Sequence, residues 1–204
     1  MSAALDLTQV RPAFADPVRQ SQSVFREVME SVARPGRVAD LGLAVDPPQG
    51  LSPAAAAVAL TLFDFETPVW LDPALAGGEA EAWLRFHCGC PLTADPAQAA
   101  FALVTDAANA PPLAAFNQGD AKYPDRSTTL ILQIAALEGG QPVTLSGPGV
   151  KGEIAIAPAG LPAGFWDQFE TNSVQFQFGV DVLLVAGQAL IGLPRSQRAK
   201  IQGG

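Results

Sequence analysis

The stretch Val-Asp-Val-Leu-Leu-Val-Ala at residues 180–186, then Gly187-Gln188, then Ala-Leu-Ile-Gly-Leu at residues 189–193, decides the fold class. Two apolar runs joined by a two-residue turn that contains glycine predict a β-hairpin. The first arm is apolar almost throughout, which is typical of a strand covered on both faces. Because a hairpin contributes an antiparallel pair, the sheet that contains it is predicted to be mixed.

Helical and extended patterns alternate upstream of this hairpin. Helices are predicted at residues 17–32, 54–63, 79–87 and 162–169. Strands are predicted at residues 67–71, 101–105, 128–136, 143–145 and 153–156. Pro68 must lie at the start of its strand or on a sheet edge, because proline lacks a backbone N–H. The pattern predicts a layered α/β fold, with residues 106–119 as a long surface excursion.

The first helix has clear boundaries. Asp16 is a good N-cap, Pro17 suits the first helical position, and Pro35-Gly36 ends the helix. Apolar residues recur at helical spacing and charged residues occupy the other positions, which predicts an amphipathic surface helix. The apolar set is Phe25, Val28, Met29 and Val32, and the charged set is Arg19, Arg26, Glu27 and Glu30.

Length and composition limit the class of protein. At roughly 150 residues per domain, 204 residues favour a single domain over residues 1–204. Hydrophobic residues make up 49% of the chain and charged residues 16%, which indicates a globular protein. The net charge of −8 leaves no electrostatic footprint for nucleic acid or an anionic membrane surface. Residues 1–6 lack the basic flank of a secretory signal, and with only two cysteines the sequence predicts a cytoplasmic location.

Few residues offer catalytic or metal-binding chemistry. His87, Cys88 and Cys90 supply three ligands, fewer than a structural zinc site needs, and neighbours in regular structure do not share a face, so no metal site is predicted. His87 is the sole histidine and no Gly-x-Ser-x-Gly accompanies a serine, so no catalytic residue is assigned. Asp64 and Glu66 read as solvated acids, and Ser146-Gly147-Pro148-Gly149 as a tight turn.

The basic residues leave two alternatives open. Arg195, Arg198 and Lys200 form the one local positive cluster, which suits a phosphate or an acidic partner, or else belongs to a solvated tail. None of the three lysines, Lys122, Lys151 and Lys200, lies in an apolar setting that would activate it for Schiff-base chemistry.

Read in order, several blocks of this sequence resemble the PhnH family, the H subunit of the bacterial carbon-phosphorus lyase core complex, over almost the whole chain. Each block is weak alone, but their order and spacing together are specific. The blocks are Phe14, Asp16-Pro17-Val18, Gln22, Phe25-Arg26, Met29, Pro35-Gly36, Leu60-Thr61-Leu62, Asp64, Thr67-Pro68-Val69-Trp70-Leu71, Leu84-Arg85-Phe86-His87, Pro91, Thr129-Leu130-Ile131-Leu132-Gln133, Leu145, Gly147-Pro148-Gly149-Val150, Gly179-Val180-Asp181 and Leu193-Pro194-Arg195.

The resemblance implies a three-layer α/β/α fold with a mixed sheet of about seven strands, like the PLP-dependent transferase fold without its cofactor. It implies a homodimer that joins the G, I and J subunits of the complex, which transfers a ribose triphosphate unit from ATP onto an alkylphosphonate. The chain departs from the usual family pattern at Gln177, at Ser196-Gln197 and at Cys88. These departures weaken any specific family contact at Arg195 and any role for Cys88 as a ligand.

The leading hypothesis is therefore a non-catalytic, accessory subunit of the phosphonate-degrading complex that takes part in forming ribose 1-methylphosphonate 5-triphosphate. Five aromatic residues would suit its interfaces, although core packing is the more usual place for each: Phe116, Trp166, Phe169, Phe176 and Phe178. The alternative is a stand-alone phosphonate- or nucleotide-phosphate-binding enzyme in which Arg85, His87 and Arg195 grip the ligand. A third possibility is a scaffold outside phosphorus metabolism.

Overall fold

The computed structural model describes residues 11–42 and 45–202 of the chain. Residues 1–6, on which the prediction of no secretory signal depends, lie outside the described residues. Within the described ranges, every helix is too short or too polar to cross a membrane.

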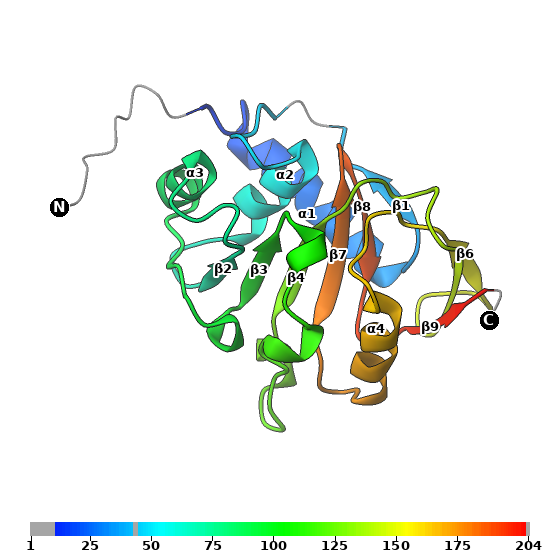
Figure 1. The fold of residues 1–204 in the computed structure, drawn as a ribbon. Coiled ribbons are helices and arrows are strands. Elements are labelled where there is room, and N and C mark those ends of the chain that lie inside the picture. Colours follow the sequence, from blue (N-terminus) through cyan, green and yellow to red (C-terminus); the bar gives the residue numbers. More distant parts are fainter. Residues whose placement is uncertain (1–10, 43–44, 203–204) are drawn as a thin grey trace.

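A mixed six-stranded sheet forms the centre of the fold (Figure 1). Its strands lie in the order β1-β8-β7-β4-β3-β2. The four strands β2, β3, β4 and β7 are parallel, whereas β8 runs antiparallel to both β7 and β1. The strand bounds are β1 Val38–Asp40, β2 Val69–Leu71, β3 Phe101–Val104, β4 Thr129–Gln133, β7 Asp181–Ala186 and β8 Ala189–Leu193. The predicted hairpin is confirmed, with Ala186 paired to Ala189 across the turn, and so is the mixed sheet.

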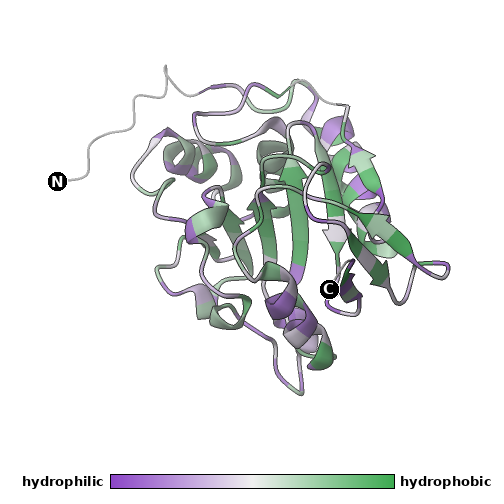
Figure 2. Cartoon of the chain, turned by 45° about the vertical axis from the view of Figure 1, so that its right-hand side comes forward, coloured by the Kyte–Doolittle hydropathy of each residue, from purple (hydrophilic) through white to green (hydrophobic). Residues whose placement is uncertain are grey.

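Both faces of this sheet are covered, and side chains that alternate along each strand enter two separate cores. In β4, Leu130 and Leu132 face one core while Ile131 faces the other. Figure 2 shows the central strands as a continuous hydrophobic layer. The continuous apolar pattern of β7 thus has the predicted cause, burial on both faces.

Three α-helices cover one face: α1 Pro17–Ala33, α2 Pro53–Leu62 and α3 Glu79–Cys88. The alanines at residues 54–57 and 59 of α2 are all buried, and their small side chains let this helix approach its neighbours closely. Ser52 caps α2, since its side chain accepts a hydrogen bond from the N–H of Ala55.

The opposite face carries α4 Phe165–Val174, a set of short 3₁₀-helices and a second sheet of three strands in the order β6-β5-β9. These strands are β5 Val143–Ser146, β6 Ile154–Ile156 and β9 Arg198–Ile201. The expected sheet of about seven strands is therefore corrected to six strands plus a separate sheet of three. The 3₁₀-helices are η2 Pro96–Gln98, η3 Ala107–Asn109, η4 Leu113–Ala115 and η5 Pro124–Arg126.

The amphipathic helix α1 turns a different face to the sheet than its hydrophobic pattern suggests. Val24, Val28 and Ser31 are buried, while Phe25 and Met29 are about half exposed. The reason is the close approach of α1 to β8, where a Cβ on Gly192 would lie 2.5 Å from the carbonyl oxygen of Ser31. A small serine at the contact allows this approach, and the larger side chains remain outside.

Two further expectations are corrected. Residues 106–119 are not a simple surface excursion, because they contain η3 and η4 and bury Leu113 and Phe116 in the core. The C-terminal residues are not a solvated tail, because Arg198 to Ile201 pair with β5 as the strand β9. Pro68 lies directly before β2, the outermost strand of the main sheet, as predicted.

Candidate functional site

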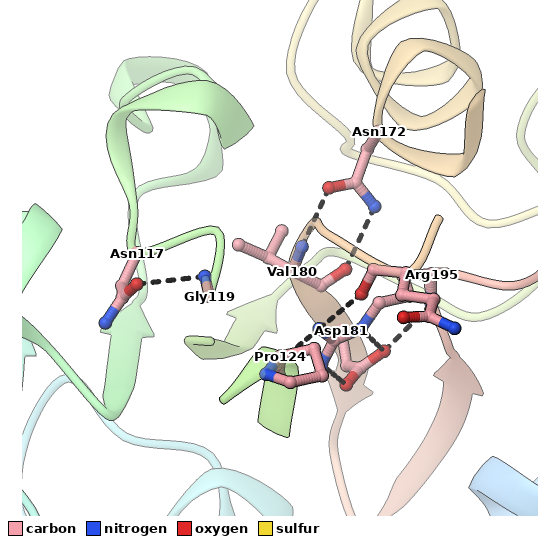
Figure 3. Close-up of polar contacts among 8 residues, drawn as sticks. Asn117, Gly119, Pro124, Asn172, Val180, Asp181 and Arg195 are labelled. Atoms are coloured by element: carbon pink, nitrogen blue, oxygen red, sulfur yellow. Dashed lines mark hydrogen bonds and ion pairs between the residues drawn. The ribbon is translucent and has the colours of Figure 1, made fainter. Parts of the chain in front are cut away.

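Arg195 is held inside the protein at the end of the hairpin. Its backbone N–H and its Nε both donate to Oδ1 of Asp181, at 2.8 and 3.1 Å, and its Nη2 pairs with Oδ2 of the same carboxylate (Figure 3). Nη1 donates to the carbonyl oxygen of Pro124 at 2.9 Å. Only 13% of the Arg195 side chain is exposed. The guanidinium therefore joins β7, β8 and η5, and most of its donors are already used.

The start of β7 is fixed by a second polar group, Asn172 of α4. Its Oδ1 accepts from the N–H of Val180 at 2.8 Å and its Nδ2 donates to the C=O of Val180 at 3.0 Å (Figure 3). Gly179 precedes this clamp with a φ of +112°, and a Cβ there would lie 2.6 Å from Oδ1 of Asn172. The Gly179-Val180-Asp181 block is therefore a structural requirement at the amino end of β7.

Arg85 and His87 lie on α3, beside the outer strand β2 and away from Arg195 (Figure 1). Residues two positions apart on a helix point to nearly opposite sides. Arg85 accordingly extends over a hollow next to β2, with its Nε donating to Glu81 at 2.9 Å. Nε2 of His87 instead lies 2.9 Å from the carbonyl oxygen of Arg11, which also accepts from Nε1 of Trp83 at 3.0 Å.

The structure thus does not bring Arg85, His87 and Arg195 to one hollow. Of these three residues, Arg85 is the one that lines a hollow of about 540 Å³ beside β2. The pKa of Glu81, the partner of Arg85, is lowered mainly by the backbone N–H of Gly77, which donates to its Oε2 at 2.7 Å. The ion pair between Glu81 and Arg85 lowers it further.

The two cysteines behave as buried thiols. Burial raises the pKa of Cys88 to about 12, with the neighbouring Cys90 as a smaller cause. Burial also raises the pKa of Cys90. Both thiols are therefore protonated at neutral pH, which disfavours either as a nucleophile. Among the residues described, no three His, Cys, Asp or Glu side chains are grouped to hold a metal ion.

The remaining residues singled out in the sequence are the three lysines, the pair Asp64 and Glu66, and the turn at residues 146–149. Lys122, Lys151 and Lys200 are all exposed. Asp64 accepts a hydrogen bond from the N–H of Glu66 at 2.9 Å, a turn at the end of α2 as expected. The predicted turn at residues 146–149 is confirmed, since the N–H of Val150 donates to the C=O of Gly147 at 3.2 Å.

Of the five aromatic residues proposed for an interface, three lie in the core. Phe116, Trp166 and Phe169 are buried, which confirms core packing for these three in place of an interface. Phe176 and Phe178, which follow α4, are 60% and 38% exposed and remain candidates.

The sequence analysis did not identify the residues that hold Arg195 and the start of β7, which are Asp181 and Asn172. The pairing of Asp181 with Arg195 follows from the hairpin register, because Val182 lies opposite Leu193 and the flanking residues must also be neighbours. The clamp by Asn172 had no such signal, because α4 was predicted to end before it.

Comparison with known proteins places this geometry in a family. The sequence pattern of the family described as "Bacterial phosphonate metabolism protein (PhnH)" matches residues 12–200. The chain belongs to the PhnH family. The matched range includes the hairpin, α3 and both ends of the parallel strands.

Two curated relatives extend the comparison. The PhnH-family chain is 47% identical over 186 residues, which cover 91% of it and 93% of the relative, to the "Alpha-D-ribose 1-methylphosphonate 5-triphosphate synthase subunit PhnH" of Rhizobium meliloti (strain 1021). It is 26% identical over 184 residues, which cover 90% of it and 88% of the relative, to the "Putative C-P lyase subunit protein HtxG" of Stutzerimonas stutzeri.

Proposed function

We propose that this chain is a non-catalytic, accessory subunit of a carbon-phosphorus lyase core complex. In that role it takes part in the ATP-dependent formation of ribose 1-methylphosphonate 5-triphosphate. The observation that carries the proposal is the 47% identity, over 91% of the chain, to a relative named as a subunit of that synthase. The second relative, named as a putative C-P lyase subunit, supports the same kind of assembly.

Exposed apolar side chains support a role in assembly. Val18, Phe25 and Met29 are 80%, 50% and 52% exposed, and their spacing of seven and four residues places them in one row along α1. Phe176 and Phe178 add a second exposed apolar group at the end of α4. Groups of large exposed apolar side chains commonly mark protein interfaces.

We propose that the α1 row carries a homodimer, and that other surfaces dock onto the G, I and J subunits. Phe25→Ser tests the dimer, because a polar residue at the middle of the row removes apolar area from that contact. Light scattering should give a mass near twice 21.1 kDa for the unaltered chain and a mass near 21.1 kDa for the variant. Phe65→Ser, at a residue 76% exposed elsewhere, is the matched control and should leave the dimer intact. A dimer that survives Phe25→Ser contradicts the assignment.

We also propose that residues 1–204 act as one cytoplasmic domain related to the PLP-dependent transferase fold, with no cofactor of its own. A mixed sheet between two covering layers supports the fold relation. The exposure of Lys122, Lys151 and Lys200 supports the lack of an activated lysine. Addition of pyridoxal phosphate to the purified chain should produce no saturable Schiff-base absorption band, and such a band at one lysine would contradict the proposal.

The alternative, a stand-alone phosphonate- or nucleotide-phosphate-binding enzyme, has less support from the geometry. Arg195 is committed to Asp181 and Pro124, and His87 faces the carbonyl oxygen of Arg11. Of the three proposed contacts, Arg85 keeps donors for an outside group. Calorimetry of the purified chain with ATP or methylphosphonate at millimolar concentration should give no binding heat. Binding that is lost in Arg195→Ala or His87→Ala would favour the enzyme instead.

An affinity pull-down tests the subunit role directly. The tagged chain is recovered from its own cells, grown with methylphosphonate as the only phosphorus source, and its companions are identified by mass spectrometry. Three partners at fixed ratio are expected, and deletion of the chain should stop growth on methylphosphonate. Recovery of the chain alone, with growth unaffected by the deletion, would support a scaffold outside phosphorus metabolism.

A further inference from the structure

The outer edge of β2 is only partly covered. Val69 directs its backbone groups outward, where its N–H donates to the C=O of Pro91 at 2.8 Å and its C=O accepts from the N–H of Thr93 at 3.0 Å. Residues 91–93 thus extend the sheet by one short parallel stretch. The chain then leaves the edge through a turn in which the hydroxyl of Thr93 accepts from the N–H of Asp95.

Leu71 is the next residue of β2 whose backbone faces outward. Backbone direction alternates along a strand, and the inward positions are fixed by the bond from the N–H of Asp72 to the C=O of Leu103. Within residues 11–42 and 45–202, no hydrogen bond reaches the N–H or C=O of Leu71 from the outer side. An unpaired N–H and C=O at a sheet edge are a template for another extended chain.

Leu71 is also one of the residues that line the hollow of about 540 Å³ beside Arg85. Most of the residues that line the hollow are apolar, and α3 contributes the charged residues Glu81 and Arg85. The lining includes Trp70, Leu71, Pro73, Leu92, Glu81 and Arg85. The hollow can therefore take an apolar side chain beside the strand edge.

Arg85 supplies the remaining chemistry of the hollow. Glu81 uses only the Nε of Arg85, and its other carboxylate oxygen is occupied by the N–H of Gly77. Neither Nη group of Arg85 makes a hydrogen bond with the part of the chain that the structure describes. Because Glu81 is already satisfied, Arg85 is the group in the hollow that can bind an incoming carboxylate.

We propose that an extended segment of a partner subunit adds to the sheet at Leu71, with one apolar side chain in the hollow and one Asp or Glu on Arg85. The inference rests on the proposed function, which supplies the partner, and it names the surface and the kind of segment. A free extended segment fits this position better than a second copy does. A second β2 would bring its own residues 91–93 and α3 to the same narrow edge.

Hydrogen exchange of the Leu71 amide, measured at residue resolution, tests the backbone bond. In the purified chain this amide should exchange much faster than the inward amides of Trp70 and Asp72. In the complex recovered with the tagged chain, its exchange should be at least about tenfold slower, since it then donates to the added segment. If partners are recovered and Leu71 exchanges unchanged, the docking proposal fails while the proposed function stands. If no partner is recovered, the proposed function fails first. Protection of Leu71 in the purified chain alone would indicate self-pairing and also overturn the proposal.

Two variants test the same surface through the yield of co-purified partners. Leu71→Pro removes an outward N–H at an edge position, where proline is tolerated, and should lower partner recovery about tenfold. Leu71→Val keeps the N–H and should not lower it. If the proline variant fails to fold, Arg85→Ala provides the second measurement, with an expected loss of about tenfold. Its control is Arg34→Ala, which removes another i,i+4 ion pair, with Glu30 at 3.2 Å. Equal recovery with Arg85→Ala and Arg34→Ala would contradict the proposal.

Discussion

The two ends of the parallel strands are each held by one aspartate, but by different means. Asp72 follows β2 at the carboxyl end and is 3% exposed. Its oxygens accept from the backbone N–H groups of Leu75, Thr105 and Asp106, at 3.2 Å for Leu75 and 2.9 Å for Asp106. Asp181 begins β7 at the amino end, and its partner is the guanidinium of Arg195.

The difference shows that an aspartate at the end of a strand can be stabilised either by backbone N–H groups or by an arginine side chain. At the carboxyl end, backbone amides of the loop after β3 surround the carboxylate, so no cation is needed. At the amino end, the hairpin places the long side chain of Arg195 next to β7. Its guanidinium donates to both Asp181 and the carbonyl oxygen of Pro124. The first arrangement depends on backbone donors, which substitutions other than proline leave in place, and the second depends on a pair of side chains.

Asp72→Ala should have the largest effect on stability. It leaves three N–H groups of a nearly buried site without their acceptor, and the free energy of unfolding should fall by about 4 kcal/mol. Urea unfolding measures the loss, and Asp72→Asn, which keeps one carbonyl oxygen, should lose about half as much. A loss below about 1 kcal/mol for Asp72→Ala would mean that water replaces the carboxylate.

Asp181→Ala should be the next largest. It leaves the mostly buried guanidinium of Arg195 without its counter-charge, and a loss of about 3 kcal/mol is expected. The double variant Asp181→Ala with Arg195→Ala should lose about 1 to 2 kcal/mol less than the sum of the two single variants. Strict additivity in this double-mutant cycle would remove the distinction between the two ends.

Arg195→Lys should cost about 1.5 kcal/mol, because lysine keeps the charge but loses the planar fork that reaches two acceptors. Thermal unfolding under identical buffer conditions compares it with Arg195→Ala, which should lose more. Equal losses for the two variants would show that geometry, and not charge, sets the strength of the amino end.

Arg85→Ala in the purified chain should have the smallest effect, about 0.5 kcal/mol or less, because its pair with Glu81 is largely exposed on the arginine side. The same urea experiment measures it. A loss comparable to that of Asp181→Ala would mean that Arg85 holds the fold, and partner recovery with this variant would then report on folding.

The elements of the main sheet could largely be predicted because each carries its own local signal. The hairpin, the prolines at the starts of α1 and α2, and the apolar run of β4 are all visible in short windows of sequence. In contrast, β1 and β9 are three- and four-residue strands with mixed polarity. Such strands exist because a partner strand from far along the chain pairs with them, and no short window contains that partner.

The candidate site was less predictable for the same reason. Arg195 and Arg85 were both identified from residue type, but their roles depend on what lies beside them. The hairpin register brings Asp181 next to Arg195, and the two form an ion pair. The turn after Thr93, in contrast, leaves the hollow near Arg85 open. The exposure of Phe25 likewise depends on Gly192 of β8, which sets the orientation of α1.

The pairing of β1 with β8 joins the beginning of the chain to its end, since Val38 lies opposite Ile191. During synthesis, the main sheet therefore cannot close until residues 189–193 have left the ribosome. The strand β1 and the face of α1 that later packs on β8 are synthesised first, and both stay open until β8 follows. A docking surface that depends on the closed sheet is consequently complete only after residues 189–193 have joined β1 and β7.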